Sequence, residues 1–302
     1  MIRELSILIP TRNDVCLPRI VMLLRMASSL EGLKYEILVS DDASSDEEVI
    51  RQNEKINALE HCTLLRQQVN HGRAANRNFL AQKAQYPWLL FLDCNIKIPN
   101  ERFLQNYLES DEVAVTNGGI FAKTNKSLEH SNLRYMYEKK IEPMHIAEQR
   151  QQRPYQSFRT SNFMVQREVM LNHPFDETLT SYGYEDVLFG KVLCNHGIPI
   201  KHIENPVFMT HFESNEVYVA KVEEAMHTLQ ALRKDLEGYS PLLSTVAMLE
   251  KWHLTPLVKL YYKSFLKRMR NKLTGTSPSI KWLNPYKLGY YLSIEDQSEK
   301  CE

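Results

Sequence analysis

Two oxygen-bearing side chains follow the most apolar short run of the sequence. Trp88 to Leu92 reads WLLFL, and Asp93 and Asn95 come directly after it in the segment FLDCNIKIP. Oxygen donors two residues apart at the end of a strand suit Mg²⁺ or Mn²⁺, which keep several waters and often bridge to a diphosphate. The two side chains together supply one formal negative charge, so a metal site here needs a third protein ligand or the diphosphate itself. A simple turn is the alternative, because Asp and Asn are also turn formers.

His211 is the candidate for that third ligand. It follows the apolar run PVFMT near the end of a predicted strand. An imidazole nitrogen there would add the ligand that Asp93 and Asn95 lack, since histidine is a common metal ligand. The alternative is a structural histidine that is satisfied by its neighbours.

Adjacent carboxylates in the segment YGYEDVLFG form a second candidate site. Glu185 and Asp186 stand between Gly183 and Gly190, and a tyrosine lies on each side of Gly183. Aromatic rings with carboxylates suit sugar hydroxyls, and a carboxylate near the reacting carbon can remove a proton from an acceptor hydroxyl. The alternative is a pair of first-turn carboxylates that the helix dipole favours.

The elements that must position these residues alternate along the first 115 positions. Apolar runs predict strands, and apolar positions at helical spacing predict helices between them, in this order: strand 5–9, helix 17–29, strand 35–40, helix 46–58, strand 62–66, helix 74–84, strand 88–92. Such alternation predicts an α/β fold with a mostly parallel sheet covered by helices on both faces. Ligands of these folds bind at the carboxyl ends of the strands.

Three polar segments follow the predicted strands and should meet at that edge of the sheet. They are Pro10 to Asn13, Asp41 to Ser44 and Asp93 to Asn95. Turn chemistry explains any one of them. The three together favour a binding site.

Composition and motifs exclude several classes of protein. The 302 residues have a formal net charge of zero, which gives no general field for nucleic acid. No G-x-G-x-x-G or P-loop motif occurs, so a bound phosphate must be met by a metal or by side chains. The five cysteines are scattered and predict reduced thiols in a cytoplasmic protein: Cys16, Cys62, Cys94, Cys194 and Cys301. No apolar run approaches eighteen residues and the N-terminus does not resemble a signal peptide, so we expect attachment to a membrane, if any, only at its inner surface.

The last fifth of the chain is basic and aromatic. Residues 251–294 contain no Asp or Glu, and Lys and Arg recur there among Trp252, Trp282, Tyr286, Tyr290 and Tyr291. This composition favours helices on an anionic membrane surface, and the alternative is a helical appendage packed on the rest of the protein. We therefore expect a catalytic domain over 1–238, with a donor half to about 118 and an acceptor half from about 119, and an appendage over 239–302.

Five segments in the same order resemble the family 2 glycosyltransferases, which have the GT-A fold. LSILIPTRN resembles the opening strand and nucleotide loop, and YEILVSDDASSD the acidic turn. NHGRAANRN, at 70–78, is similar to the family's N-x-G-x-x-x-A-R-N-like segment, with Arg77 in the basic slot, and LLFLDCN falls where the D-x-D metal motif lies. The fifth segment, ending in YGYEDVLFG, is most similar to bacterial galactosyl- and galactosaminyl-type transferase domains such as those of chondroitin polymerases. The resemblance covers about residues 3–215.

The resemblance implies a role for each candidate residue. Nucleotide-sugar binding falls to these residues: Thr11, Asp41, Asp42, Arg77, Asp93 and Asn162. Asp93, Asn95 and His211 would hold a divalent metal, Mn²⁺ or Mg²⁺. Asp186 would be the catalytic base, and Glu185 would position the acceptor. Asn95 departs from the family, which usually has a second aspartate at this position.

The function so implied is inverting transfer of a sugar from a nucleotide diphosphate donor, most simply a UDP-sugar. The acceptor would be a hydroxyl of a saccharide or a lipid-linked glycan, in the synthesis of a cell-surface polysaccharide. A non-catalytic binding protein with the same fold and a degenerate metal site is the alternative, and Asn95 is its support.

Overall fold

The computed structural model describes residues 2–298, which fold into two compact units. The first unit contains Met1–Lys123, Glu142–Thr180 and Glu185–His211, and the second contains Thr124–Ile141, Ser181–Tyr184 and Phe212–Glu302. The chain therefore leaves the first unit twice before residue 211. This division differs from the expected boundary at residue 238.

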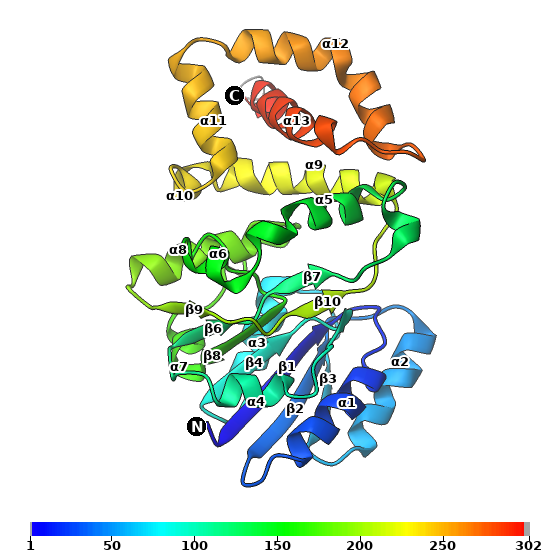
Figure 1. Ribbon diagram of the computed structural model, residues 1–302, viewed down its shortest axis with the longest axis vertical. Helices are drawn as coiled ribbons and strands as arrows, with labels where there is room; N and C mark the ends of the chain where they lie inside the picture. The colour runs from blue at the N-terminus through cyan, green and yellow to red at the C-terminus, as the bar shows by residue number, and fades with distance from the viewer. Residues whose placement is uncertain (1, 299–302) are drawn as a thin grey trace. The chain divides into compact units, whose positions relative to one another are not determined.

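A seven-stranded sheet forms the centre of the first unit within residues 2–298 (Figure 1). Its order is β3-β2-β1-β4-β8-β6-β9, and its strands are β1 (Glu4–Thr11), β2 (Lys34–Asp41), β3 (Cys62–Arg66), β4 (Trp88–Leu92), β6 (Val115–Asn117), β8 (Asn162–Gln166) and β9 (Ile200–His202). All neighbouring strands are parallel except β8, which runs antiparallel to β4 and to β6. The predicted mostly parallel sheet is confirmed.

A small second sheet follows β4 along the chain. It has the order β5-β10-β7, with β5 (Ile96–Lys97), β7 (Ile120–Ala122) and β10 (Val207–Met209). Strand β10 is antiparallel to β5, and Met209 is paired with Ile96. This pairing joins the segment after β4 to a segment more than a hundred residues later.

The helices of the first unit follow the predicted alternation. They are α1 (Leu17–Ser28), α2 (Glu47–Glu54), η1 (Lys55–Ala58), α3 (Arg73–Lys83), α4 (Phe103–Leu108), η3 (Glu142–Met144), α6 (Ala147–Gln151), α7 (Arg167–Asn172) and α8 (Glu185–Asn195). The helix predicted at 46–58 is divided into α2 and the 3₁₀ turn η1.

Alternating side chains of β4 separate two hydrophobic cores. Trp88, Leu90 and Leu92 pack into the core that contains the buried residues of α1 and α4. Leu89 and Phe91 pack into the opposite core, with buried residues of α3, α7 and α8. A strand that is buried on both faces has no polar alternation, which explains why WLLFL is apolar throughout. The helices on both faces are confirmed.

The second unit consists of helices within the described residues. They are η2 (Lys126–Leu128), α5 (Leu133–Ile141), α9 (Asn215–Ala231), α10 (Arg233–Leu236), α11 (Pro241–Lys251), α12 (Thr255–Thr274), η4 (Ile280–Trp282) and α13 (Leu283–Ser298). Tyr218 and Val222 of α9 share a buried cluster with Met269 of α12 and Tyr286 of α13. The unit therefore begins before residue 238, because α9 supplies part of its core.

The aromatic residues expected at a membrane surface do not all face outward. Tyr286 is 1% exposed and Tyr291 0%, and Trp282 and Tyr290 are partly buried against the core of the second unit. The expectation is wrong for Tyr286 and Tyr291, which are buried, and Tyr286 packs in the cluster that α9, α12 and α13 share. Trp252 is exposed.

Two further expectations concern cysteines and membrane spans. Cys16, Cys62, Cys94 and Cys194 have free thiols, and Cys301 lies outside the described residues. Along residues 2–298, the helices are each too short or too polar to span a bilayer.

Replacing Gly190 by Ala should destabilise the first unit by about 1–3 kcal/mol through overpacking. A Cβ atom at this position of α8 would lie 2.3 Å from the carbonyl oxygen of Tyr155, which is too close for any side chain. Chemical denaturation would measure the change in the free energy of unfolding. The matched control is Cys194→Ala on the exposed side of the same helix, which should change stability little. Equal stability of Gly190→Ala and wild type would contradict this packing.

Candidate active site

The loops that follow β1 and β2 are joined to each other at the carboxyl edge of the sheet. Thr11 and Asp41 are partners in the β1–β2 register, and the amide of Asp42 donates to the carbonyl of Thr11 at 2.9 Å. The amide of Asn13 donates to the hydroxyl of Ser44 at 2.7 Å. These contacts form one surface from two of the three polar segments that the sequence placed here.

Asp41 has one satisfied and one unsatisfied carboxylate oxygen. Its Oδ1 accepts hydrogen bonds from the amide and the hydroxyl of Ser44, at 2.9 and 2.5 Å. Its Oδ2 is buried without a hydrogen-bond donor, and the Nε of Arg66 lies 3.9 Å away. A buried carboxylate oxygen that lacks a donor is costly, so this atom has the capacity to accept a hydrogen bond from a ligand.

Asp42 shapes the loop before α3. Its two carboxylate oxygens accept hydrogen bonds from the amides of His71 and Gly72, at 2.8 and 2.9 Å. Gly72 has φ +90°, a left-handed conformation that favours glycine, and α3 begins at the next residue. Each oxygen accepts one of these hydrogen bonds, so Asp42 holds the loop before α3 in position.

Helix α3 is fixed so that Arg77 lies at the site. Asn76 donates to the carbonyl of Ser40 at 3.2 Å, and Asn78 donates to the carbonyl of Phe175 at 2.9 Å. Between these anchors, the Nη2 of Arg77 donates to the Oδ1 of Asp93 at 2.8 Å. The Arg77 side chain is 3% exposed and that of Asp93 is 27% exposed. A buried guanidinium is thus paired with a carboxylate that reaches the surface.

The second sheet brings the segment after β4 next to the segment that leads to His211. Ile96 pairs with Met209, and the hydroxyl of Thr210 is 3.5 Å from the carbonyl oxygen of Asn95. His211 follows Thr210 in the chain, so an antiparallel register continued by two residues would bring it to the turn that contains Asp93 and Asn95. Asn95 and His211 are both exposed, so they are accessible to a ligand.

These donors fit a divalent cation. A carboxylate, an amide oxygen and an imidazole offer two oxygen atoms and one nitrogen, which suit Mn²⁺ or Mg²⁺ with water or diphosphate completing the shell. Among the side chains that the structure describes, those of residues 2–294, no group of three or more from His, Cys, Asp and Glu is arranged to hold a metal. A metal at this site therefore requires Asn95 or the ligand's own oxygens, in addition to Asp93 and His211.

Glu185 and Asp186 begin α8, and Asp186 has a perturbed pKa. Burial and, after it, the nearby negative charge of Glu185 raise the pKa of Asp186 to about 6, although Arg159, the amide of Val187 and Arg77 act to lower it. The amide of Val187 also donates to Asp186, at 2.8 Å. A carboxylate with a pKa near the working pH is suited to act as a general base.

Two arginines at the site were missed by the sequence reasoning. The Nη1 of Arg73 lies 3.9 Å from the Oε1 of Glu185, and Arg159 acts on the charge of Asp186. Arg73 precedes Arg77 by four residues, so both lie on one face of α3, and this spacing was a usable signal. Arg159 follows no strand and belongs to no recognised motif, so it could not be selected from the sequence.

Asn162 is occupied within the fold. Its Oδ1 accepts a hydrogen bond from the hydroxyl of Tyr107 at 2.7 Å, and its Nδ2 donates to the carbonyls of Gly119 and Asn205, both at 2.9 Å. The side chain is buried between β8 and the β6–β7 turn. The structure therefore does not support Asn162 as a sugar ligand, because its amide connects three backbone segments.

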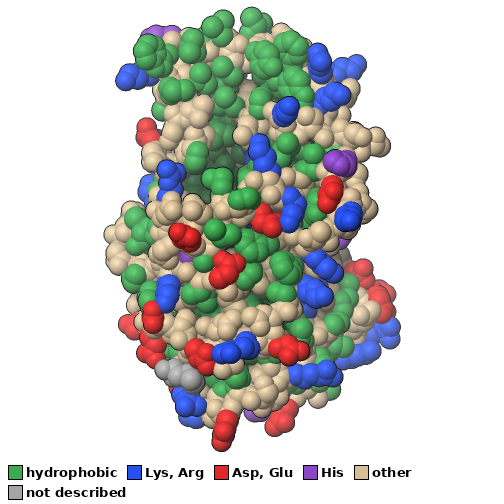
Figure 2. Space-filling model, in the orientation of Figure 1, with side chains coloured by type: hydrophobic (Ala, Val, Ile, Leu, Met, Phe, Trp, Pro, Cys, Tyr) green, Lys and Arg blue, Asp and Glu red, His purple; other side chains and the backbone are tan. Residues whose placement is uncertain are grey.

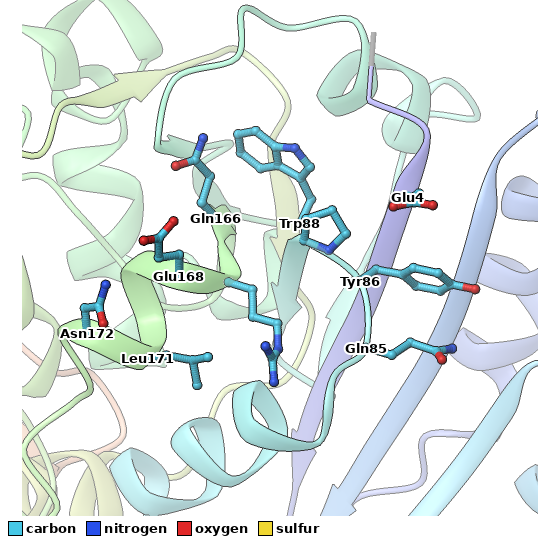
Figure 3. Close-up of a pocket in the computed structure, with 10 residues that line it drawn as sticks. Glu4, Gln85, Tyr86, Trp88, Gln166, Glu168, Leu171 and Asn172 are labelled. Atoms are coloured by element: carbon cyan, nitrogen blue, oxygen red, sulfur yellow. The ribbon is translucent and has the colours of Figure 1, made fainter.

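A separate cavity lies at the opposite edge of the sheet. It has a volume of about 720 Å³ and is wide open to solvent, and Figure 3 shows Glu4, Tyr86, Trp88 and Gln166 among the residues around it. Glu4 and Trp88 are the first residues of β1 and β4, whereas the candidate site lies after the last residues of these strands. The cavity is therefore distinct from the candidate site.

Comparison with known proteins identifies a family for most of the first unit. The family model described as glycosyl transferase family 2 matches residues 6–173. A protein of Haemophilus influenzae described as an uncharacterized glycosyltransferase is 30% identical over 89 residues, which span 30% of this chain and 28% of the relative. The matched part is thus less than a third of that relative's length.

Solved structures share the fold of the chain. A mannosyltransferase from Pyrobaculum calidifontis, solved with GDP-Man and Mn²⁺, aligns with a TM-score of 0.55 and 14% identity over 98% of this chain and 87% of that one. The mannosyl-3-phosphoglycerate synthase of Rubrobacter xylanophilus aligns with a TM-score of 0.51 and 14% identity over 77% of this chain and 74% of that one. At this identity the likeness concerns the fold, and it confirms the expected GT-A architecture with a helical C-terminal region.

Replacing Asp186 by Asn should raise the free energy of unfolding near neutral pH by roughly 1–2 kcal/mol. The pKa of Asp186 is about 6 in the folded protein, whereas the ordinary value for an aspartate is 3.8. The raised pKa therefore stabilises the wild type fully below about pH 4, and this stabilisation is lost as the pH rises through 6. An asparagine has no charge to bury at any of these pH values.

Urea unfolding across this pH range would measure the difference between the two proteins. The gain from Asp186→Asn should shrink toward zero at acidic pH. Glu168→Gln, at an exposed position of the same unit, is the control and should show no such pH dependence. A constant difference at every pH would show that the pKa of Asp186 is not raised.

Proposed function

Because the chain belongs to glycosyl transferase family 2, we propose that it is an enzyme that transfers a sugar from a nucleotide diphosphate donor to an acceptor hydroxyl, with inversion at the anomeric carbon. The supporting observation is the position of Arg77. Its guanidinium binds Asp93 at 2.8 Å and also lies close enough to Asp186 to lower that carboxyl's pKa. One cation therefore connects the carboxylate proposed for the metal–diphosphate with the carboxylate proposed as the base.

The donor nucleotide would bind over the loops that follow β1 and β2. The free Oδ2 of Asp41 is suited to accept a hydrogen bond from an N–H group of the base, and uracil has such a group. Thr11 lies beside Asp41 in the register. Arg77 would add positive charge where the diphosphate departs. We therefore propose a UDP-sugar as the donor.

The divalent metal would be held by Asp93, Asn95 and His211. When bound, Mn²⁺ or Mg²⁺ supplies charge neutralisation to the diphosphate that leaves. Asp93 is paired with Arg77, and His211 lies two residues after the end of β10, the strand that pairs with β5.

Asp186 would remove the proton from the acceptor hydroxyl as this oxygen attacks the anomeric carbon. The oxygen forms the new glycosidic bond while the bond to the diphosphate breaks on the opposite face, so a single displacement inverts the configuration. Glu185, held near Arg73, would orient the acceptor. Burial keeps the pKa of Asp186 at about 6, so the carboxyl is a stronger base than an ordinary aspartate and is still ionised at neutral pH.

The acceptor proposed is a hydroxyl of a saccharide or of a lipid-linked glycan, used in making a cell-surface polysaccharide. Tyr182 and Tyr184, just before Glu185 in the sequence, offer aromatic rings of the kind that sugars stack on. A lipid-linked acceptor would bring the enzyme to the inner surface of a membrane.

The second candidate is a non-catalytic nucleotide-binding protein, and Asn95 is the observation in its favour. Isothermal titration with UDP, with and without Mn²⁺, separates the two candidates. The enzyme should bind UDP more tightly when Mn²⁺ is present, and a protein with a degenerate site should not respond to the metal.

Asp186→Asn should lower sugar transfer by about 10²–10⁴-fold, because it removes the general base. Titration with UDP and Mn²⁺ should show unchanged nucleotide affinity, since Asp186 is assigned to the acceptor side. Transfer would be followed by the release of UDP from several UDP-sugars with a saccharide acceptor. Turnover at the wild-type rate would exclude Asp186 as the base, and Glu168→Gln serves again as the control.

Asn95→Asp should increase the affinity for Mn²⁺ roughly tenfold, because a second carboxylate adds charge to the ligand set. The Mn²⁺ concentration that gives half-maximal UDP binding would be compared in the two proteins. Asn172→Asp adds the same charge at an exposed position of the first unit and should leave this concentration unchanged. The same Mn²⁺ dependence in Asn95→Asp and wild type would remove Asn95 from the metal site.

A further inference from the structure

Exposed hydrophobic side chains gather at the corner between α11 and α12. Among the described residues, six of the eleven large hydrophobic side chains that are exposed fall between positions 248 and 261: Met248, Trp252, Leu254, Leu257, Leu260 and Tyr261. Trp252 is 67% exposed, and Leu257 and Leu260 are each 63% exposed. Exposed hydrophobic residues that occur singly are ordinary, but a group in one short segment indicates an interaction surface. We call these six residues the apolar corner.

The apolar corner is not part of the core of the second unit. Helix α12 buries Tyr262, Met269 and Leu273 in the cluster that it shares with α9 and α13. Leu257, Leu260 and Tyr261 have the spacing i, i+3, i+4, which places them together on the outward side of the same helix. Since α12 already has a buried apolar face, the outward residues are in excess of what its packing needs.

Basic side chains continue the outward side of α12 beyond the apolar corner. Lys267, Arg268 and Lys272 follow Leu257, Leu260 and Tyr261 at helical spacing, and all three are exposed. Residues 251–294 contain nine Lys and Arg and no Asp or Glu. Figure 2 shows hydrophobic side chains gathered over α11 and α12 with Lys and Arg beside them. This surface therefore consists of the apolar corner and, next to it, a row of positively charged side chains.

We propose that this surface binds the headgroup region of an anionic lipid membrane. The apolar corner inserts among the headgroups, with the Trp252 ring at the boundary between water and lipid, and the basic residues of α12 contact lipid phosphates. A membrane matches the chemistry better than a protein partner does, because a uniform positive charge beside flexible apolar side chains needs no complementary shape. The composition assigned membrane binding to the whole of residues 251–294. The surface proposed here is instead the apolar corner together with the outward side of α12.

This inference depends on the second unit alone and does not require the proposed sugar transfer. It also differs from the earlier expectation in its geometry. Six side chains at a corner insert as a wedge, whereas the full length of an amphipathic helix would lie flat in the interface. The corner therefore gives weak, reversible binding that depends on anionic lipid.

Vesicle flotation with the full-length protein tests the proposal. Wild-type protein should float with vesicles of phosphatidylcholine and phosphatidylglycerol, and it should bind vesicles of phosphatidylcholine alone at least about tenfold more weakly. Added salt should weaken binding to the anionic vesicles, because it screens the lipid charge.

Two sets of substitutions separate the apolar and the charged contributions. The triple variant Trp252→Ser, Leu257→Ser, Leu260→Ser should reduce binding to anionic vesicles by about tenfold or more. The triple variant Lys267→Gln, Arg268→Gln, Lys272→Gln should reduce it by a similar factor and should remove the dependence on salt. Thermal unfolding of each variant would verify that it is folded, and the wild-type measurement does not depend on any variant.

The control is Met144→Ser with Leu171→Ser, which changes two exposed hydrophobic residues of the first unit and should leave vesicle binding unchanged. Failure of the wild type to bind anionic vesicles would overturn the proposal, and so would equal loss in the control. Light scattering would also detect a dimer of the wild type. If the Trp252, Leu257 and Leu260 substitutions convert a dimer to a monomer while vesicle binding is absent, the corner binds a second copy of the chain and the membrane proposal is wrong.

Discussion

The ion pair between Arg77 and Asp93 is the interaction on which the candidate site depends. A guanidinium that is 3% exposed is stable only with a nearby negative charge, and the Asp93 carboxylate supplies it at 2.8 Å. The same guanidinium lowers the pKa of Asp186, which burial and Glu185 raise. Arg77 thus limits how far that carboxyl departs from ordinary acidity. A single buried cation therefore acts on both carboxylates.

Much of the surrounding structure fixes the position of this cation. Asp42 binds the amides before α3, Gly72 supplies the left-handed turn, and Asn76 and Asn78 attach the helix on both sides of Arg77. A motif search would identify these polar side chains as ligand-binding residues. In this structure they form hydrogen bonds with the protein backbone. A buried guanidinium needs such support, since a small displacement would separate it from its carboxylate and leave both charges poorly compensated.

The strands and the polar segments at their ends were predictable because they depend on local patterns. The run of apolar residues in β4 and the aspartates after β2 and β4 are visible in any short window of sequence. Contacts between distant segments were not predictable in this way. The hydrogen bonds that occupy Asn162 come from residues 107, 119 and 205, and the burial of Tyr286 depends on a helix that starts at residue 215. Arg159 reaches Asp186 only through the folded arrangement. Residue types at the strand ends could therefore be used to predict the site. The burial of a given side chain could not be predicted, because it depends on distant segments.

The pairing of β5 with β10 has a consequence for the order of folding. Asn95 and Thr210 are in contact although 115 positions separate them, and β5 has only two residues with which to make the pairing. Closing so long a loop is entropically unfavourable until the rest of the first unit has formed, so this small sheet should assemble late. A chain that has made β1 to β4 would possess Asp93 and Asn95 in place but would still lack His211. With the metal ligands proposed above, metal affinity would be acquired in the last step of folding and would report that the first unit is complete.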